Sequence, residues 1–174
     1  MNKFIKYFLI TIFLIFSSEL LAQEKIAILD LKHVLNESKA GKGAQDFLKK
    51  TYNQNIKKFK EIETSLKEEE ADLLSKRSVL SQEEYTKKSD NLRKKVIDFR
   101  SQRRTAMDKI TTQRAESRST LLKSITPILE TYIKENNISV VLNKVHTLGW
   151  NPENDITNII VEKLNKVLPS LDLK

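Results

Sequence analysis

The sequence contains no cysteine, and it has only three glycines, three prolines and two histidines among its 174 residues. Without cysteine the chain can form no disulfide and has no thiol nucleophile. The two histidines, His33 and His146, are not placed at the spacing of metal ligands. No serine lies in a nucleophile-elbow motif, and the carboxylates are spread along helical surfaces instead of being paired. We therefore expect no catalytic site, no metal site and no bound cofactor, so the sequence argues against an enzyme.

The first 22 residues have the three parts of a signal peptide. Lys3 and Lys6 give a positively charged start, residues 7–16 form an apolar run, and Ala22 ends a plausible cleavage segment. The apolar run is shorter than the roughly 20 residues that cross a bilayer, which disfavours a membrane anchor. We expect the chain to be exported, with cleavage near Ala22 and Gln23.

Residues 39–135 contain only three helix-disfavouring glycine and proline residues, Gly41, Gly43 and Pro127. Apolar residues recur there at spacings of three and four, which is typical of helices with a narrow apolar seam. Gly41 and Gly43 lie in a segment that we interpret as a flexible joint rather than a phosphate loop, because the other residues of that motif are missing. Pro127 predicts a bend in the later part of the stretch.

The middle of this stretch carries the signals of a helix start. Residues Ser81–Glu84 have the pattern of a capping box, in which Ser81 and Glu84 satisfy each other's backbone N–H groups. We therefore predict two antiparallel helices with a tip near residues 78–81. Two such helices would form a coiled-coil-like arm roughly 60 Å long, too slender to be the inside of a globule.

The flanking segments, 23–38 and 136–174, predict a small head that contains β-strands. Residues 25–29 and 138–142 are short apolar runs that suit strands, and 145–148 form a third candidate strand. The predicted fold class is therefore mainly α with a small β head, that is, α+β.

Polar residues at the ends of these segments predict helix caps. Asp30 would cap a short helix and Asp155 the last helix, while Asn136 and Asn137 suit the end of the long returning helix. A head this small buries too little surface to be stable alone, so we expect several subunits to pool their strands. The candidates for this oligomerisation surface are Ile26, Ile28, Val140 and Leu142.

The net charge of +8 is not spread evenly. Residues 45–84 contain eight basic and nine acidic side chains, whereas residues 86–123 contain twelve basic and four acidic ones. The second helix of the arm is therefore strongly basic, which favours an anionic partner. A nucleic acid is not expected, because export argues against it and the seam lacks interleaved aromatic side chains for stacking bases.

The order of these elements, together with residues in the head and at the tip, resembles the Skp/OmpH family of periplasmic chaperones. The matching segments are Lys25–Asp30, Val34–Gly43, Leu80–Tyr85, Val141–Asn143 and Asp155–Thr157. This resemblance implies a periplasmic homotrimer whose arms surround a cavity and hold unfolded outer-membrane β-barrel proteins without ATP. It also implies lipopolysaccharide or an anionic membrane surface as a further partner, although no lipopolysaccharide site can be matched residue by residue.

The function predicted from the sequence is therefore a holdase that prevents the aggregation of its clients. Its client-binding candidates are the basic residues of the second helix: Lys87, Lys88, Arg93, Lys94, Lys95, Arg100, Arg103, Arg104, Lys109, Arg114 and Arg118. Two alternatives stay open, a structural or docking coiled-coil protein of the cell envelope and, less favoured, a polyanion-binding helical protein.

Overall fold

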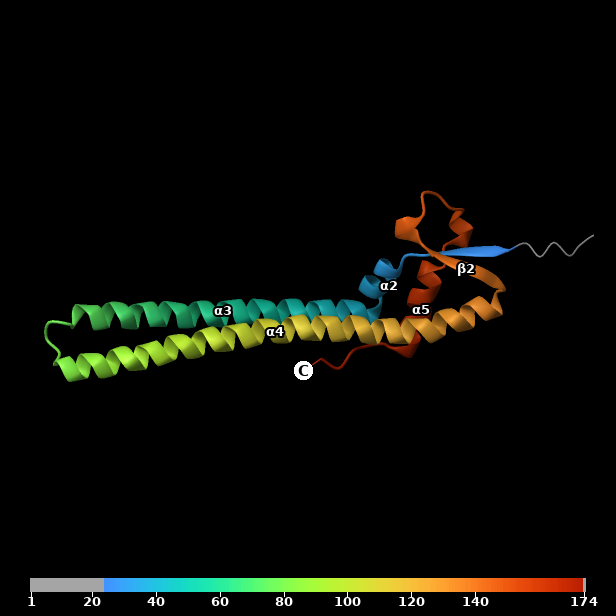
Figure 1. Ribbon diagram of the computed structural model, residues 1–174. Coiled ribbons are helices and arrows are strands. Elements are labelled where there is room, and N and C mark those ends of the chain that lie inside the picture. The colour runs from blue at the N-terminus through green and yellow to red at the C-terminus, as the bar shows by residue number, and fades with distance from the viewer. Residues whose placement is uncertain (1–23, 174) are drawn as a thin grey trace, which may run out of the picture.

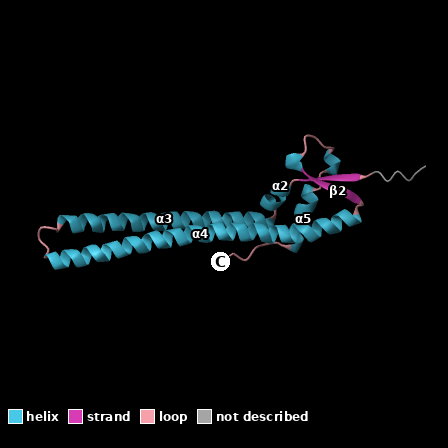
Figure 2. Ribbon diagram, viewed as in Figure 1, coloured by secondary structure: helices cyan, strands magenta, loops and turns pink. Residues whose placement is uncertain are grey.

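The computed structural model describes residues 24–173, which form a long two-helix arm and a small head (Figures 1 and 2). The predicted signal peptide, 1–22, lies outside the described residues. The fold is mainly α-helical with one small sheet, as the sequence predicted.

The arm consists of α3 (Lys39–Ser75) and α4 (Gln82–Glu135), which lie side by side over most of its length. The predicted capping box between them is confirmed: the Ser81 hydroxyl accepts the N–H of Glu84 at 3.3 Å, and the Ser81 N–H donates to Glu84 Oε2 at 3.1 Å. Phe59 and Phe99 meet edge to face in the seam, with ring centroids 6.0 Å apart. α4 continues through Pro127, and its last turns rise toward the sheet (Figure 1).

The sheet of the head has two parallel strands, β1 (Lys25–Leu29) and β2 (Ile138–Asn143). Ile26 lies opposite Val140, and Ile28 lies opposite Leu142. Parallel strands need a long crossover connection, and here that connection includes the whole arm. At the start of β2, Asn137 adopts a left-handed conformation with φ of 51°, which asparagine tolerates better than most residues.

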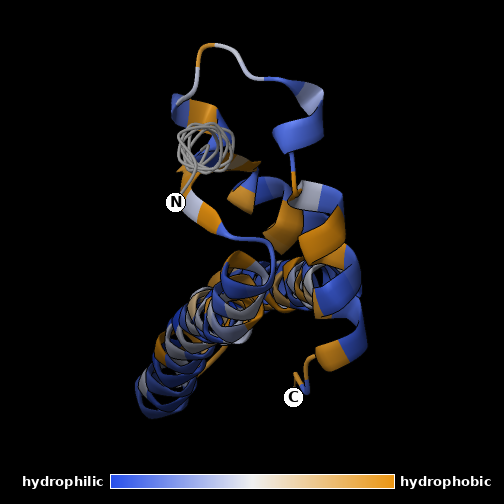
Figure 3. Cartoon of the chain, turned by 90° about the vertical axis from the view of Figure 1, so that its right-hand side faces the viewer, coloured by the Kyte–Doolittle hydropathy of each residue, from blue (hydrophilic) through white to orange (hydrophobic). Residues whose placement is uncertain are grey.

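The core of the head joins segments from both ends of the chain. α2 (Leu31–Glu37) and α5 (Thr157–Val167) pack against the base of the arm. Figure 3 shows hydrophobic residues gathered in the head, while most residues of the arm are hydrophilic. The buried cluster comprises Ala27, Leu29, Val34, Leu35, Ala40, Leu121, Ile125, Ile138, Ile156, Ile160 and Leu164.

Local caps fix the entry into the arm. Asp30 caps α2 as predicted, since its Oδ1 accepts the N–H of His33 at 2.8 Å. The expected flexible joint is wrong: residues 39–43 are helical, and the buried Ser38 caps α3 by accepting the N–H of Gly41 at 3.2 Å. Asn165 of α5 also accepts the N–H of Lys39 at 2.7 Å. The arm is therefore anchored to the head at its first residue.

The predicted third strand, 145–148, is also wrong. Residues Lys144–His146 form a 3₁₀ helix instead. Its cause is local: Asn143 Oδ1 accepts the N–H of Val145 at 3.2 Å, and the Thr147 hydroxyl donates to the Asn143 carbonyl at 3.0 Å. These two bonds turn the chain immediately after β2.

The expected cap of α5 is wrong by one position. Ile156 is the N-cap residue, without a side-chain bond, while Asp155 Oδ1 accepts the N–H of Thr157 at 3.0 Å. Asp155 forms an isolated parallel bridge with Ile28, where the Ile156 N–H donates to the Ile28 carbonyl at 2.9 Å. The start of α5 is thus tied to β1.

Candidate functional site

All eleven predicted client-binding residues have exposed side chains on α4. Three of them form ion pairs: Arg93 with Asp90 at 3.8 Å, Lys95 with Glu69 at 2.7 Å, and Arg104 with Asp108 at 3.8 Å. None of the other eight forms an ion pair with a carboxylate in residues 24–173. Most of the positive charge on α4 is therefore available to an anionic partner.

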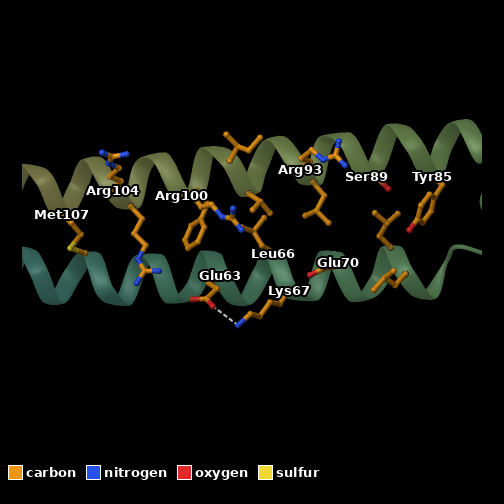
Figure 4. Close-up of a pocket in the computed structure, with 17 residues that line it drawn as sticks. Glu63, Leu66, Lys67, Glu70, Tyr85, Ser89, Arg93, Arg100, Arg104 and Met107 are labelled. Atoms are coloured by element: carbon orange, nitrogen blue, oxygen red, sulfur yellow. Dashed lines mark hydrogen bonds and ion pairs between the residues drawn. The ribbon is translucent and has the colours of Figure 1, made fainter.

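The two helices of the arm leave a groove along one side of its outer half, which we call the outer groove (Figure 4). Its volume is about 990 Å³. In Figure 4 Tyr85, Arg100 and Met107 project from α4 toward α3, and Leu66 projects from α3 toward α4. Its residues are Glu63, Leu66, Lys67, Glu70, Leu73, Leu74, Tyr85, Ser89, Leu92, Arg93, Val96, Ile97, Phe99, Arg100, Arg103, Arg104 and Met107.

The outer groove combines apolar surface with an excess of positive charge. Five cationic side chains line it against two carboxylates. One of these carboxylates, Glu63, is already paired with Lys67 at 2.8 Å. The hydrogen bond and charge of Lys67 lower the pKa of Glu63 below its ordinary value, with a smaller contribution from Arg103. The groove therefore presents net positive charge beside apolar side chains at neutral pH.

The opposite side of the arm is different, and we call it the polar side. A groove of about 470 Å³ is lined there by four lysines and three carboxylates, with Leu73 as the single apolar residue. Lys95 bridges the helices by donating to both carboxylate oxygens of Glu69, at 2.7 and 2.8 Å. The charges on this side are close to balance.

The structure thus divides the predicted basic residues instead of bringing them together. Arg93, Arg100, Arg103 and Arg104 line the outer groove, and Lys88, Lys94 and Lys95 line the polar side. Arg114 and Arg118 line a separate cleft near the head, and neither Lys87 nor Lys109 lines any of these three grooves.

Two exposed apolar residues of the outer groove, Leu74 and Ile97, were not predicted from the sequence. Leu74 and Ile97 are 57% and 58% exposed, although they lie beside seam residues that are mostly covered. Leu74 directly follows the seam residue Leu73, and Ile97 directly follows Val96. These two adjacent apolar pairs were the sequence signal from which the exposed residues could have been predicted. An apolar residue one position beyond the seam widens the stripe on one side only.

The cleft near the head, which we call the foot cleft, has a volume of about 570 Å³. Its walls come from α2, the first four turns of α3 and the facing part of α4. They comprise Leu35, Asn36, Gly41, Ala44, Gln45, Leu48, Lys49, Tyr52, Arg114, Ser117, Arg118 and Leu121. The predicted binding residues Arg114 and Arg118 therefore belong to a second, smaller concavity.

The predicted oligomerisation residues lie on one face of the sheet. Ile26, Val140 and Leu142 are 42%, 41% and 41% exposed, whereas Ile28 is only 2% exposed. The register places all four on the same face, because Ile26 pairs with Val140 and Ile28 with Leu142. Three of the four thus leave apolar surface uncovered in the single chain.

The loop that follows β2 closes with a charged contact. Lys144 Nζ donates to Asp155 Oδ2 at 2.9 Å and lies 4.8 Å from the centre of the Trp150 ring. Burial raises the pKa of Asp155, but the hydrogen bonds from Thr157 and Lys144 outweigh it and hold that pKa below its ordinary value. The loop is therefore pinned beside β1 by an ionised carboxylate.

Neither a metal site nor a membrane span is found in the described part of the chain. No three His, Cys, Asp or Glu side chains gather there in a way that could hold a metal ion. Among residues 24–173 no helix is both long and apolar enough to cross a bilayer.

Comparison with known proteins agrees with this architecture. Residues 25–164 match the model of the family described as outer membrane protein (OmpH-like). A Skp-like protein of Pseudomonas aeruginosa is 27% identical over 171 residues, which cover 96% of this chain and 99% of the relative. A crystal structure described as that of an OmpH-like outer membrane chaperone from Caulobacter crescentus has a TM-score of 0.79 at 18% identity, covering 88% and 90% of the two chains. The chain described here belongs to the OmpH-like family.

Proposed function

We propose that this protein is an ATP-independent holdase chaperone of the periplasm, which binds unfolded outer-membrane β-barrel proteins and keeps them from aggregating. Membership of the OmpH-like family and the likeness to proteins described as Skp-like and as an outer membrane chaperone support this proposal. The single observation that carries it is the outer groove, which joins exposed apolar side chains to exposed arginines along an elongated arm.

Such a surface suits an unfolded chain better than a folded one. An unfolded polypeptide exposes apolar side chains, and their contact with Leu74 and Ile97 would remove apolar surface from water. An acidic client would also be attracted by the positive charge of the arginines. Each exposed charge contact contributes only about 0–1 kcal/mol. Many weak contacts at high effective concentration can still hold a chain tightly while leaving it mobile. No step of this mechanism requires a nucleotide or a bond-making reaction.

A cavity between arms requires more than one subunit. In this proposal residues 23–38 and 136–174 form the head, and residues 39–135 form the arm of each subunit in a homotrimer. The exposed face formed by Ile26, Val140 and Leu142 supports such an assembly, because burying it would remove apolar surface from water. Three arms rooted in one head would bring three outer grooves to a single client.

The test is suppression of aggregation when an unfolded outer-membrane protein is diluted from urea. Light scattering should fall at about one trimer per client without ATP, and adding ATP should change nothing. An equal concentration of a folded, equally basic protein controls for charge alone. Unchanged scattering at equimolar trimer, or a requirement for ATP, would overturn the proposal and favour a structural or docking role in the envelope.

A further inference from the structure

The foot cleft differs from the outer groove in its charge, because no carboxylate lines it. Three cationic side chains, Lys49, Arg114 and Arg118, stand around a cleft whose other residues are neutral. Arg114 and Arg118 are four residues apart on α4, so their side chains lie on the same face, about 6 Å apart at their Cβ atoms. Lys49 approaches from α3, on the other wall.

The bottom of the foot cleft is apolar. Ala44, Leu48 and Leu121 are each at most 5% exposed, so they form a floor rather than a rim. Among the neutral polar residues of the cleft, the Ser117 hydroxyl donates to the Gln113 carbonyl at 2.6 Å, and Gln45 Nε2 donates to Asn36 at 3.3 and 3.4 Å. With this apolar floor and three cationic side chains, the cleft suits a ligand that has an apolar body and one anionic group.

The foot cleft lies on the same face of the arm as the outer groove. Lys49 and Lys67 are eighteen residues apart on α3, as are Arg100 and Arg118 on α4. Eighteen residues make five complete turns of an α-helix, so the members of each pair point to the same side. The rise between them is about 27 Å, which an extended polypeptide covers in about eight residues.

From these observations we propose that the foot cleft binds the C-terminal end of an extended client polypeptide. The terminal carboxylate would pair with Arg114 and Arg118, whose planar guanidinium groups match a carboxylate, and Lys49 would add a third charge. The last apolar side chains would lie on Leu48 and Leu121. The remaining chain would continue along the same face into the outer groove. This inference rests on the proposed function, because it assumes that the arm holds unfolded chains.

The test compares two fluorescently labelled apolar peptides of the same sequence, one with a free C-terminal carboxylate and one with a C-terminal amide. Fluorescence anisotropy with the purified protein at low salt measures both affinities. We expect the free acid to bind about tenfold more tightly than the amide. Arg114→Gln/Arg118→Gln should bind both peptides equally weakly, and Lys49→Gln should reduce the preference in the same direction.

The matched control is Lys88→Gln/Lys94→Gln, which removes the same charge from the polar side and should keep the preference for the free acid. All substituted side chains are exposed, so circular dichroism should show unchanged melting for each variant. Equal affinity of the wild-type protein for acid and amide would overturn the inference. Loss of the preference in the polar-side control would do so too, since it would show a general charge effect.

A fatty acid also combines an apolar body with one carboxylate, so palmitate tests this alternative ligand of the foot cleft. If palmitate binds in a way that depends on Arg114 and Arg118 and neither peptide does, the cleft accepts a fatty acid and the inference is wrong. The proposed function is read out separately in the aggregation assay. If the wild-type protein suppresses aggregation but shows no preference for the free acid, the holdase function is supported and only the chain-end site is refuted.

Discussion

At the scale of single residues, Gly41 shows how closely α2 and α3 approach each other. A Cβ atom at this position would lie 1.9 Å from the Leu35 carbonyl oxygen and 2.9 Å from Ser38 Oγ. The first of these neighbours is backbone and cannot move aside without shifting the end of α2. Glycine at position 41 is thus needed for packing, not for backbone freedom.

We expect Gly41→Ala to destabilise the protein by about 3 kcal/mol, because an added methyl group overpacks a buried site. Thermal unfolding at fixed protein concentration measures the effect. Gly43→Ala is the matched control: nothing lies within 4 Å of its Cβ position, so alanine should stabilise the helix by about 0.5–1 kcal/mol. Similar melting temperatures for the two variants would contradict this account.

Asp155 gives the head a dependence on pH. Its pKa is below the ordinary value, so its contribution to stability is fully present above the ordinary pKa and is lost as the pH falls through the folded-state pKa. Asp155→Asn should lower the free energy of unfolding by about 1 kcal/mol near neutral pH, by removing the ion pair with Lys144. Urea unfolding near pH 7 and near pH 3 should show this difference shrinking in acid. Glu153→Gln, in the same loop, should behave like the wild type at both pH values.

Residue-level features could be predicted where their signal is local. The Asp30 cap, the Ser81–Glu84 box and the end of α4 at Asn136 each depend on a few consecutive residues, and the structure confirms them. Gly41 and Asp155 act through contacts with the end of α2 and with β1. Sequence alone did not reveal these tertiary contacts, so a flexible joint and a simple helix cap were expected there.

At the scale of elements, the arm has two chemically different sides. The seam could be predicted, because apolar spacing identifies the residues that face the partner helix. The difference between the outer groove and the polar side could not be predicted in this way. It depends on which charges of α3 stand opposite those of α4, as Glu69 stands opposite Lys95. The register between two helices is set by packing along the whole arm, not by either helix alone.

This asymmetry predicts that charge removal has an effect on one side only. Arg100→Gln/Arg104→Gln should weaken binding of an acidic unfolded client by about tenfold at low salt, since each exposed charge contributes up to about 1 kcal/mol. Lys88→Gln/Lys94→Gln, with the same loss of charge on the polar side, should change the affinity by less than about twofold. Binding titrations at low and high salt measure both variants. If the two lose affinity equally, net charge and not the outer groove governs binding.

At the scale of the whole molecule, the sheet is the least complete part of the structure. It has two strands, and the apolar residues Ile26, Val140 and Leu142 stay exposed on one face. The sequence predicted both strands, because each is a short apolar run. It also predicted a third strand, but a 3₁₀ helix stabilised by hydrogen bonds to Asn143 takes its place. An isolated two-stranded sheet is marginally stable in water, so a neighbouring subunit is the natural cover for this face.

We therefore expect the wild-type protein to be a trimer in solution and Val140→Glu/Leu142→Glu to dissociate it. Burying two carboxylates in an apolar interface costs far more than the lost contacts contribute, so association should fail while the helices stay folded. Sedimentation velocity measures the mass, and circular dichroism measures the helix content. Val79→Glu is the control, because Val79 is an exposed apolar residue at the tip of the arm, far from this surface. It should remain a trimer.

A double variant that still sediments as a trimer would show that the subunits meet elsewhere. A monomeric wild-type protein would remove the shared cavity on which the holdase proposal depends.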